Sequence, residues 1–154
     1  MTLRERFNQA LKDAMRARDQ RRVSTLRLVL AALKDRDIAN RSEDSREVIG
    51  DEEILSLLAK MIKQREESAQ AFEAGGRPEL AAGEREEIAI IREFQPAQMS
   101  DSETRAAIAA AVVEVGATSP KDMGKVMAAL KSRYPGRMDF AKAAAIAKEL
   151  LAAQ

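Results

Sequence analysis

The sequence predicts an all-α protein with two helical units, and three observations lead to this prediction. Alanine, glutamate, lysine, leucine and arginine make up 84 of the 154 residues, an enrichment typical of long helices. Apolar side chains recur every three or four residues, and no useful stretch shows the strict alternation of a half-buried strand. Capping residues and glycine or proline breaks occur where this periodicity stops, so that the ends of each helix can be placed.

The first 95 residues are expected to form a unit of four helices. Thr2 and Glu5 have the spacing of a capping box, and a helix should run from there to about residue 18. A second helix should begin around Asp19. It should be largely buried, because Leu28 and Val29 widen a seam that other apolar residues already form.

Two further helices should complete this unit. Residues 40–50 are rich in Ser, Asp and Glu and indicate a connection, after which Asp51 is a good N-cap for a helix that reaches about residue 72. Glycine and proline within residues 75–78 should end that helix and begin the next. The fourth helix is expected to pack inward through apolar side chains and one aliphatic stem: Leu80, Glu84, Ile88, Ile91 and Phe94.

A domain boundary is expected after residue 95. Pro96 is incompatible with a helix interior, and Ser100 with Glu103 forms a second capping box a few residues later. The sequence therefore divides into residues 1–95 and residues 96–154. The second part is close to the size at which a single core becomes marginal.

The second part should contain three helices. The first should end near Gly116, a residue suited to a left-handed C-terminal cap. The next should start at Ser119–Pro120, an N-cap followed by a proline in the first turn. Asp139 should cap the last helix. The predicted architecture is an N-terminal four-helix unit followed by a small three-helix C-terminal domain.

The composition excludes several kinds of chemistry. The chain has no Cys and no His, and so lacks disulfides, a thiolate nucleophile, zinc–thiolate sites and the commonest general base. No metal and no cofactor are expected. The longest apolar stretch, residues 106–113, is too short to span a bilayer, and the charges at residues 4–6 are unlike a secretory signal. We therefore expect a cytoplasmic protein without membrane contact.

Charge is unevenly distributed along the chain. The net charge of +1 combines +6 in residues 1–41, −7 in residues 42–99 and +2 in residues 100–154. Separation of this kind is found in proteins with an anion-binding end, and it also arises from solvated helix faces. Both interpretations are open from the sequence.

The most specific local pattern lies just after Ser119. Lys121 and Lys125 are one helical turn apart, so that backbone N–H groups, the helix dipole and two ammonium groups could converge on one phosphate. Gly124 falls between them in an expected helix interior, where glycine costs about 1 kcal/mol relative to alanine. Close approach of RNA would explain this glycine. The alternative is a capped helix with solvated lysines and a tight helix crossing at Gly124.

Three strings carry a resemblance to a known family. They are STLR at residues 24–27, IKQREES at residues 62–68 and GATSPKDMGKVM at residues 116–127. Together they resemble the GatB/YqeY family, in particular its free-standing YqeY-like proteins, over nearly the whole chain. The resemblance implies a helical N-terminal domain and a small helical domain similar to the C-terminal tail of GatB, the B subunit of the glutamine-dependent tRNA amidotransferase. Because that tail is associated with tRNA recognition, the resemblance implies tRNA, or a tRNA-handling enzyme, as partner.

Two residues of the turn before the last helix are further candidates. Arg137 would add a bidentate phosphate contact to the two lysines if the chain returns toward them, and is otherwise an ordinary surface arginine. Tyr134 could stack on a base, but a single aromatic residue beside a proline more often fills a core.

A secondary basic patch is predicted around the junction of the first two helices, at Arg18, Arg21, Arg22 and Arg27. Arginines this close repel one another unless carboxylates or an external anion compensate them, and the acidic middle of the chain can supply the carboxylates. We favour internal pairing over an RNA-facing patch. A polar belt at residues 63–68 has two similar interpretations, a network between helices or a recognition surface.

Catalysis by this chain alone is not expected. Adjacent carboxylates such as Glu86 and Glu87 point about 100° apart on a helix and cannot act on one substrate as a general acid/base pair. A phosphate-binding glycine loop and the amidase signature are both missing from the sequence. The leading hypothesis is a non-catalytic accessory protein that binds tRNA phosphates, or a tRNA-handling enzyme, through its C-terminal domain. The alternatives are a protein-interaction adaptor without RNA contact, and a component of carbon–nitrogen ligation with glutamine as amido-N-donor, which the resemblance implies.

Overall fold

The computed structural model describes residues 1–153, and within them the secondary structure is entirely helical. The chain divides into two compact units, Met1–Gln95 and Pro96–Gln154, each with its own hydrophobic core. None of the described helices is long and apolar enough to cross a membrane.

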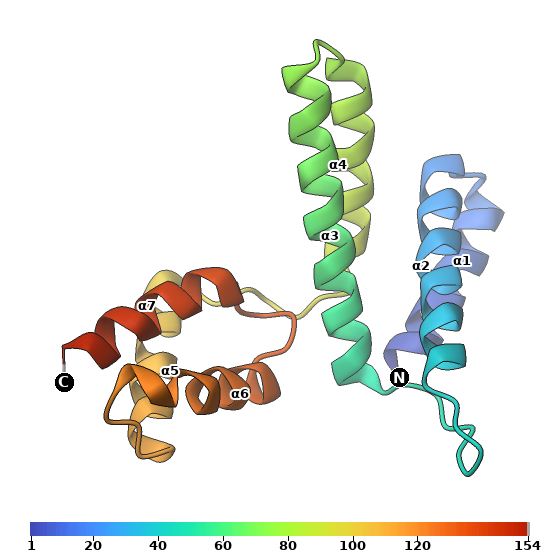
Figure 1. Ribbon diagram of the computed structural model, residues 1–154. Helices are drawn as coiled ribbons and strands as arrows, with labels where there is room; N and C mark the ends of the chain where they lie inside the picture. The colour runs from blue at the N-terminus through green and yellow to red at the C-terminus, as the bar shows by residue number, and fades with distance from the viewer. Residues whose placement is uncertain (154) are drawn as a thin grey trace. The chain divides into compact units, whose positions relative to one another are not determined.

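The first unit consists of two helical hairpins (Figure 1). One hairpin pairs α1 (Leu3–Ala17) with α2 (Gln20–Ala39), and the other pairs α3 (Asp51–Ala74) with α4 (Pro78–Arg92). The four helices share one core, which includes the fully buried side chains of Phe7, Leu26, Leu33, Ile54, Leu58 and Ile91. The predicted all-α class is therefore confirmed, with α1 to α4 lying within residues 1–95.

Local signals explain most of the helix ends in this unit. The capping box of Thr2 and Glu5 is formed at the start of α1, and the Asp19 carboxylate accepts a hydrogen bond from the Arg22 backbone N–H at the start of α2. The expected cap at Asp51 is wrong by one residue, because Gly50 takes the N-cap position. The Asp51 carboxylate instead accepts a hydrogen bond from the backbone N–H of Leu3, at 3.3 Å.

Two core assignments from the sequence are also wrong. Leu28, expected to widen the buried face of α2, is 47% exposed, and Leu80 is 39% exposed, while Ala81 is buried in its place. Apolar residues cover so much of α2 that periodicity alone does not say which side is left uncovered. In α4 the helical phase turns the alanine inward and the leucine outward.

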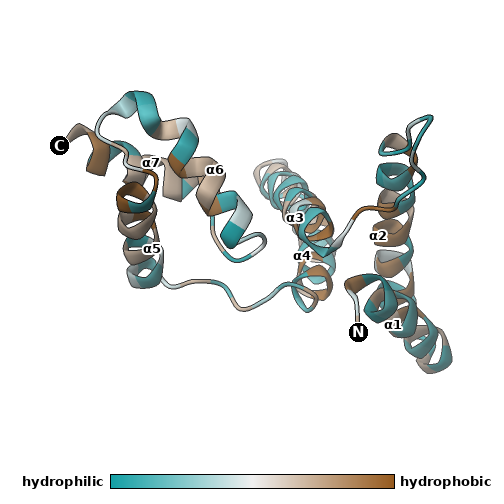
Figure 2. Cartoon of the chain, turned by 90° about the horizontal axis from the view of Figure 1, so that it is seen from below, coloured by the Kyte–Doolittle hydropathy of each residue, from teal (hydrophilic) through white to brown (hydrophobic). Residues whose placement is uncertain are grey.

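The second unit contains α5 (Asp101–Glu114), a short 3-10 turn η1 (Pro120–Asp122), α6 (Met123–Arg133) and α7 (Phe140–Ala152). Its core includes Ile108, Val126, Leu130, Ala143, Ala147 and Leu151. Figure 2 shows apolar shades over the later turns of α5, in keeping with its run of alanine, isoleucine and valine, and hydrophilic shades at its first turn. Gly116 has a φ of +66°, as expected for the left-handed position that ends a helix.

The segment before α5 belongs to this second unit. The backbone N–H of Met99 donates to the carbonyl of Arg137 at 2.9 Å, and the Gln98 side chain donates to the Gly136 carbonyl. Gly136 is buried with a φ of +72°, a conformation that favours glycine. The turn between α6 and α7 is therefore fixed against the chain that enters the unit.

Candidate nucleic-acid interface

Lys121, Gly124 and Lys125 lie together at the start of α6. Lys121 is in the 3-10 turn, and the other two are in the first turn of the helix. All three residues are exposed. Within residues 1–153 neither lysine has a carboxylate within ion-pair distance. This helix start, which carries the positive end of the helix dipole, therefore presents two ammonium groups to the outside.

The surroundings of Gly124 are open. A Cβ built on this residue meets no other atom within 4 Å, so the tight helix crossing that the sequence left open as an alternative is not formed within the described chain. Gly124 is the second residue of α6, because the helix begins at Met123 and not at Pro120 as expected. It therefore lies outside the helix interior where the full propensity cost applies. What remains is a stretch of backbone, between two lysines, that an outside group can approach closely.

The backbone N–H groups just before α6 are already used within the chain. The Asp122 carboxylate accepts hydrogen bonds from the backbone N–H groups of Thr118, at 2.9 Å, and Ser119, at 3.4 Å. The Thr118 N–H is the main cause that holds the pKa of Asp122 below its usual value, and the charge of Lys125 contributes further. The expected convergence of free amides on a phosphate is thus only partial, and attraction for an anion rests mainly on Lys121 and Lys125.

Arg137 does not join the two lysines. It follows α6, whereas Lys121 precedes it, and Figure 1 shows these two segments at opposite ends of the helix. The eleven residues of α6 rise about 16 Å along its axis. The Arg137 Nε donates to the carbonyl of Ala97 at 3.0 Å. An anion at the lysines is therefore out of reach of Arg137, which can act only as a separate contact.

Arg137 also influences an acidic neighbour. The pKa of Glu103 is lowered chiefly by the hydrogen bond from the Ser100 backbone N–H, and the charge of Arg137 adds a smaller effect. Tyr134, the other candidate from this turn, is half-buried against the core of the second unit. This packing agrees with a core role for the tyrosine.

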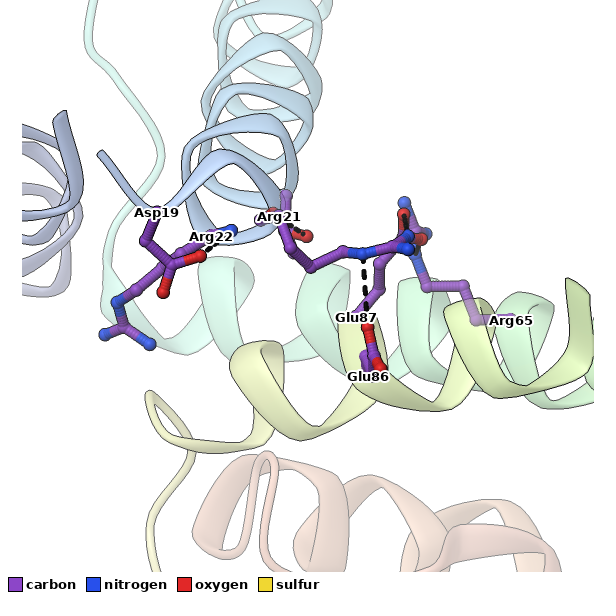
Figure 3. Close-up of polar contacts among 7 residues, drawn as sticks. Asp19, Arg21, Arg22, Arg65, Glu86 and Glu87 are labelled. Carbon is purple, nitrogen blue, oxygen red and sulfur yellow. Dashed lines mark hydrogen bonds and ion pairs between the residues drawn. The ribbon is translucent and has the colours of Figure 1, made fainter. Parts of the chain in front are cut away.

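Half of the secondary basic patch is paired within the chain. Figure 3 shows the Arg21 guanidinium reaching from α2 to two carboxylates of α4. Its Nε lies 3.2 Å from Glu86, and its Nη1 lies 3.6 Å from Glu87. Glu87 is in turn bound by Arg65 of α3 at 3.1 Å. Arg21 thus belongs to an ion network that links three helices.

The other arginines of this patch differ from one another. Arg22 forms an ion pair with Glu93 at 2.6 Å. Arg18 is exposed and ends α1 with a φ of +56°. Arg27 is exposed on α2. Internal pairing, the interpretation favoured from the sequence, therefore holds for Arg21 and Arg22.

Because Gly83 has no side chain, the Arg21 guanidinium can lie close to α4 at this position. A Cβ built on Gly83 would lie 3.3 Å from the Nη1 atom of Arg21, closer than most real contacts of a Cβ. The missing side chain therefore has a structural reason inside the chain. No sequence signal pointed to this contact, because the two residues lie on different helices.

The polar belt at residues 63–68 also connects helices. Arg65 binds Glu87, and Glu66 binds Arg92 at 2.7 Å, so both residues join α3 to α4. Lys63 and Glu67 remain exposed. The belt is thus a network between helices at two of its positions and solvent-facing at others. Within residues 1–153, no group of three or more acidic side chains is arranged to hold a metal ion.

Comparison with models of known families identifies the family of this chain. A family model for Yqey-like proteins matches residues 4–151. The chain therefore belongs to the YqeY-like family, as the three strings in the sequence indicated.

Several curated relatives of this chain bear one name. Altered inheritance of mitochondria protein 41, mitochondrial, of Kluyveromyces lactis is 34% identical over 91 residues, which cover 59% of this chain and 47% of that protein. The protein of the same name from Lachancea thermotolerans is 30% identical over 112 residues, or 71% of this chain and 58% of the relative. That of Saccharomyces cerevisiae is 32% identical over 84 residues, 54% of this chain and 43% of the relative. The matched part of this chain thus spans about half the length of the curated relatives.

Proposed function

We propose that this protein is a non-catalytic accessory protein that binds tRNA through the start of α6. Lys121 and Lys125 would neutralise phosphates, and Gly124 would let the nucleic-acid backbone approach the helix. The observation that carries the proposal is the open surface of Gly124 between two exposed lysines that have no carboxylate partner within residues 1–153. Arg137 would contribute a second contact at the far end of α6.

Binding of this kind is driven by the release of counterions. Its affinity should fall steeply with salt and depend little on sequence, because phosphate contacts carry no direct sequence information. In filter binding with total tRNA, we expect clear retention at low salt and strong weakening at physiological salt. No detectable binding even at low salt would overturn the proposal.

A double variant tests the residues themselves. Lys121→Ala with Lys125→Ala should remove most of the binding and reduce the slope of log affinity against log salt by about 2. The control is Lys131→Ala with Lys148→Ala, which removes the same charge from two other exposed lysines of the second unit. Equal losses in the two double variants would show that net charge alone matters.

The partner could instead be a protein, such as a tRNA-handling enzyme. Recovery of partners with the tagged protein, with and without nuclease, separates the two cases. Partners lost with the RNA support tRNA binding, whereas partners that survive nuclease favour an adaptor.

A part in glutamine-dependent carbon–nitrogen ligation is tested separately, by measuring ammonia release with and without added amidotransferase subunits. The proposal also keeps the cytoplasmic location expected from the sequence, which cell fractionation would check.

A further inference from the structure

A groove of about 350 Å³ lies between α2 and α3 of the first unit. Its apolar lining residues are Ala32, Ala39, Leu57 and Met61, and the last two are buried members of the core. The charged side chains of Arg36 and Lys60 line it from the two different helices. The groove therefore combines an apolar floor with polar walls, which is the usual character of a surface that receives an amphipathic segment.

The walls of the groove carry an excess of positive charge. Three basic residues line it, Arg36, Lys60 and Arg65, against one acidic residue, Asp35. Arg65 is neutralised by its ion pair with Glu87. For Arg36 and Lys60, no carboxylate within residues 1–153 lies at ion-pair distance. Arg36 on the α2 wall and Lys60 on the α3 wall are therefore available to a partner that carries acidic groups, and Asp35, beside Arg36, is the one opposing charge among the described lining residues.

Apolar surface continues beyond the groove along α2. Leu28 is 47% exposed, and it precedes Ala32 by one helical turn, so that both lie on the same edge of the helix. Ala39, also exposed, lines the groove two turns after Ala32. The core of the first unit buries only part of the apolar surface of α2. The rest of that surface can be buried by another molecule.

The length of the groove limits its occupant. Its lining residues run from Ala32 to Ala39 on α2 and from Leu57 to Arg65 on α3, a rise of about 10 to 12 Å along each helix. This distance corresponds to about two turns of a bound helix. Such a helix presents one set of anchors at positions i, i+3 or i+4, and i+7.

We propose that this groove binds an amphipathic helix of a partner protein, with about two turns of apolar anchors flanked on both sides by Glu or Asp. The apolar anchors would cover Ala32, Leu57 and Met61, and the acidic flanks would meet Arg36 and Lys60. Charge complementarity selects this occupant over a basic or neutral helix. The proposal concerns the first unit alone and does not depend on tRNA binding by the second.

Two synthetic helices test the proposal on the full chain. Both are stapled fluorescent peptides of about 16 residues with the same apolar positions, because shorter or unconstrained helices are marginal in water. One carries Glu on its flanks, and the other carries Lys. Fluorescence anisotropy should show the Glu-flanked helix binding at least about tenfold more tightly. Amide chemical-shift changes should concentrate on residues 28–39 and 57–65.

Matched variants separate a specific groove from general attraction. Lys60→Glu should weaken binding of the Glu-flanked helix by about tenfold. Lys63→Glu makes the same charge change on the same helix but outside the groove, and should leave binding nearly unchanged. Ala39→Trp should also weaken binding, because it fills the groove from an exposed position that the core does not use.

Three results would overturn the proposal. The first is equal affinity for the two peptides, or no affinity for either. The second is equal weakening by Lys60→Glu and Lys63→Glu, since binding would then reflect only net charge. The third is a dimer in solution that Ala39→Trp dissociates, because the groove would then be occupied by a second copy of this chain. Loss of tRNA binding in other experiments would leave these results unaffected.

Discussion

In each of the two units a basic side chain lies near a glycine on a helix, but the two differ in whether that side chain is paired with carboxylates. In the first unit Arg21 lies over Gly83 and reaches the carboxylates Glu86 and Glu87. In the second unit Gly124 has open space above it, and Lys121 has no carboxylate at ion-pair distance within the described residues.

The difference teaches that a basic cluster in a sequence does not by itself mark a binding surface. The arginines of the secondary basic patch are the denser cluster, yet Arg21 is paired with carboxylates of α4 and Arg22 with Glu93 just after that helix. In the sparser pair of lysines of the second unit, both side chains are exposed and neither has a carboxylate at ion-pair distance within residues 1–153. Access and pairing, rather than the density of charge, decide which cluster can meet an external anion.

The largest effect is expected from removing a core side chain, which tests whether the two units are separate. Leu130 is fully buried in the second core. Leu130→Ala should cost about 2 to 5 kcal/mol, a large share of the stability of a unit this small. Hydrogen exchange should show loss of protection in residues 96–153 while the first unit stays protected.

Leu26→Ala is the matched change in the first core, because Leu26 is equally buried there. It should lower protection in residues 1–95 and leave the second unit nearly unchanged. If either substitution destabilises both units by the same amount, the two cores do not behave as separate cores.

An intermediate effect is expected from replacing Asp37, whose carboxylate accepts hydrogen bonds from Arg4 and from the backbone of Ile49 in the first unit. A side-chain hydrogen bond from Arg4, supported by one from the Ile49 backbone N–H, holds the pKa of Asp37 below its usual value. A carboxylate with a lowered folded-state pKa stabilises the fold above its unfolded pKa of about 3.9, and this contribution disappears as the pH falls through the folded value.

Asp37→Asn should therefore lower the free energy of unfolding at pH 7 by about 1 to 2 kcal/mol. Urea unfolding at several pH values should show this difference shrinking toward zero below about pH 4. Asp35→Asn is the control, because Asp35 is exposed on the same helix. A difference for Asp37→Asn that is independent of pH would contradict the role of its charge.

The smallest effect is expected from the two glycines themselves. Gly124→Ala should raise the stability of the second unit by no more than about 1 kcal/mol, since a Cβ meets nothing there and alanine favours a helix. Gly83→Ala should gain less, because its Cβ would press on the Arg21 guanidinium. Thermal melts of the two variants compare these changes directly. A larger gain for Gly83→Ala would mean that Arg21 moves aside at no cost.

Local rules predicted the helices well, because caps and breaks act within a few residues. Thr2 with Glu5 and Ser100 with Glu103 form the expected capping boxes, and Gly116 takes the expected left-handed conformation. The start of α6 was placed too early, since residues 120–122 form a 3-10 turn. A proline suits the first turn of either kind of helix, so the pattern could not separate them.

The geometry of the candidate site depends on how distant parts of the chain come together in space, which the spacing of residues in the sequence does not reveal. The sequence placed Lys121 and Lys125 on one turn, but the side on which Arg137 lies follows from the path of the chain after α6. The groove between α2 and α3 was missed entirely. Its only sequence signal was the excess of apolar residues on α2, which we interpreted as burial and which instead leaves Leu28 exposed.

The most direct test of the account compares two double charge reversals that change the net charge equally. They are Arg21→Glu with Arg22→Glu, and Lys121→Glu with Lys125→Glu, each measured for its melting temperature and its affinity for total tRNA at low salt. We predict that the arginine pair lowers the melting temperature and keeps most of the affinity, whereas the lysine pair keeps the melting temperature and loses affinity by about tenfold or more. An arginine variant that loses as much affinity as the lysine variant, without any loss of stability, would contradict the account.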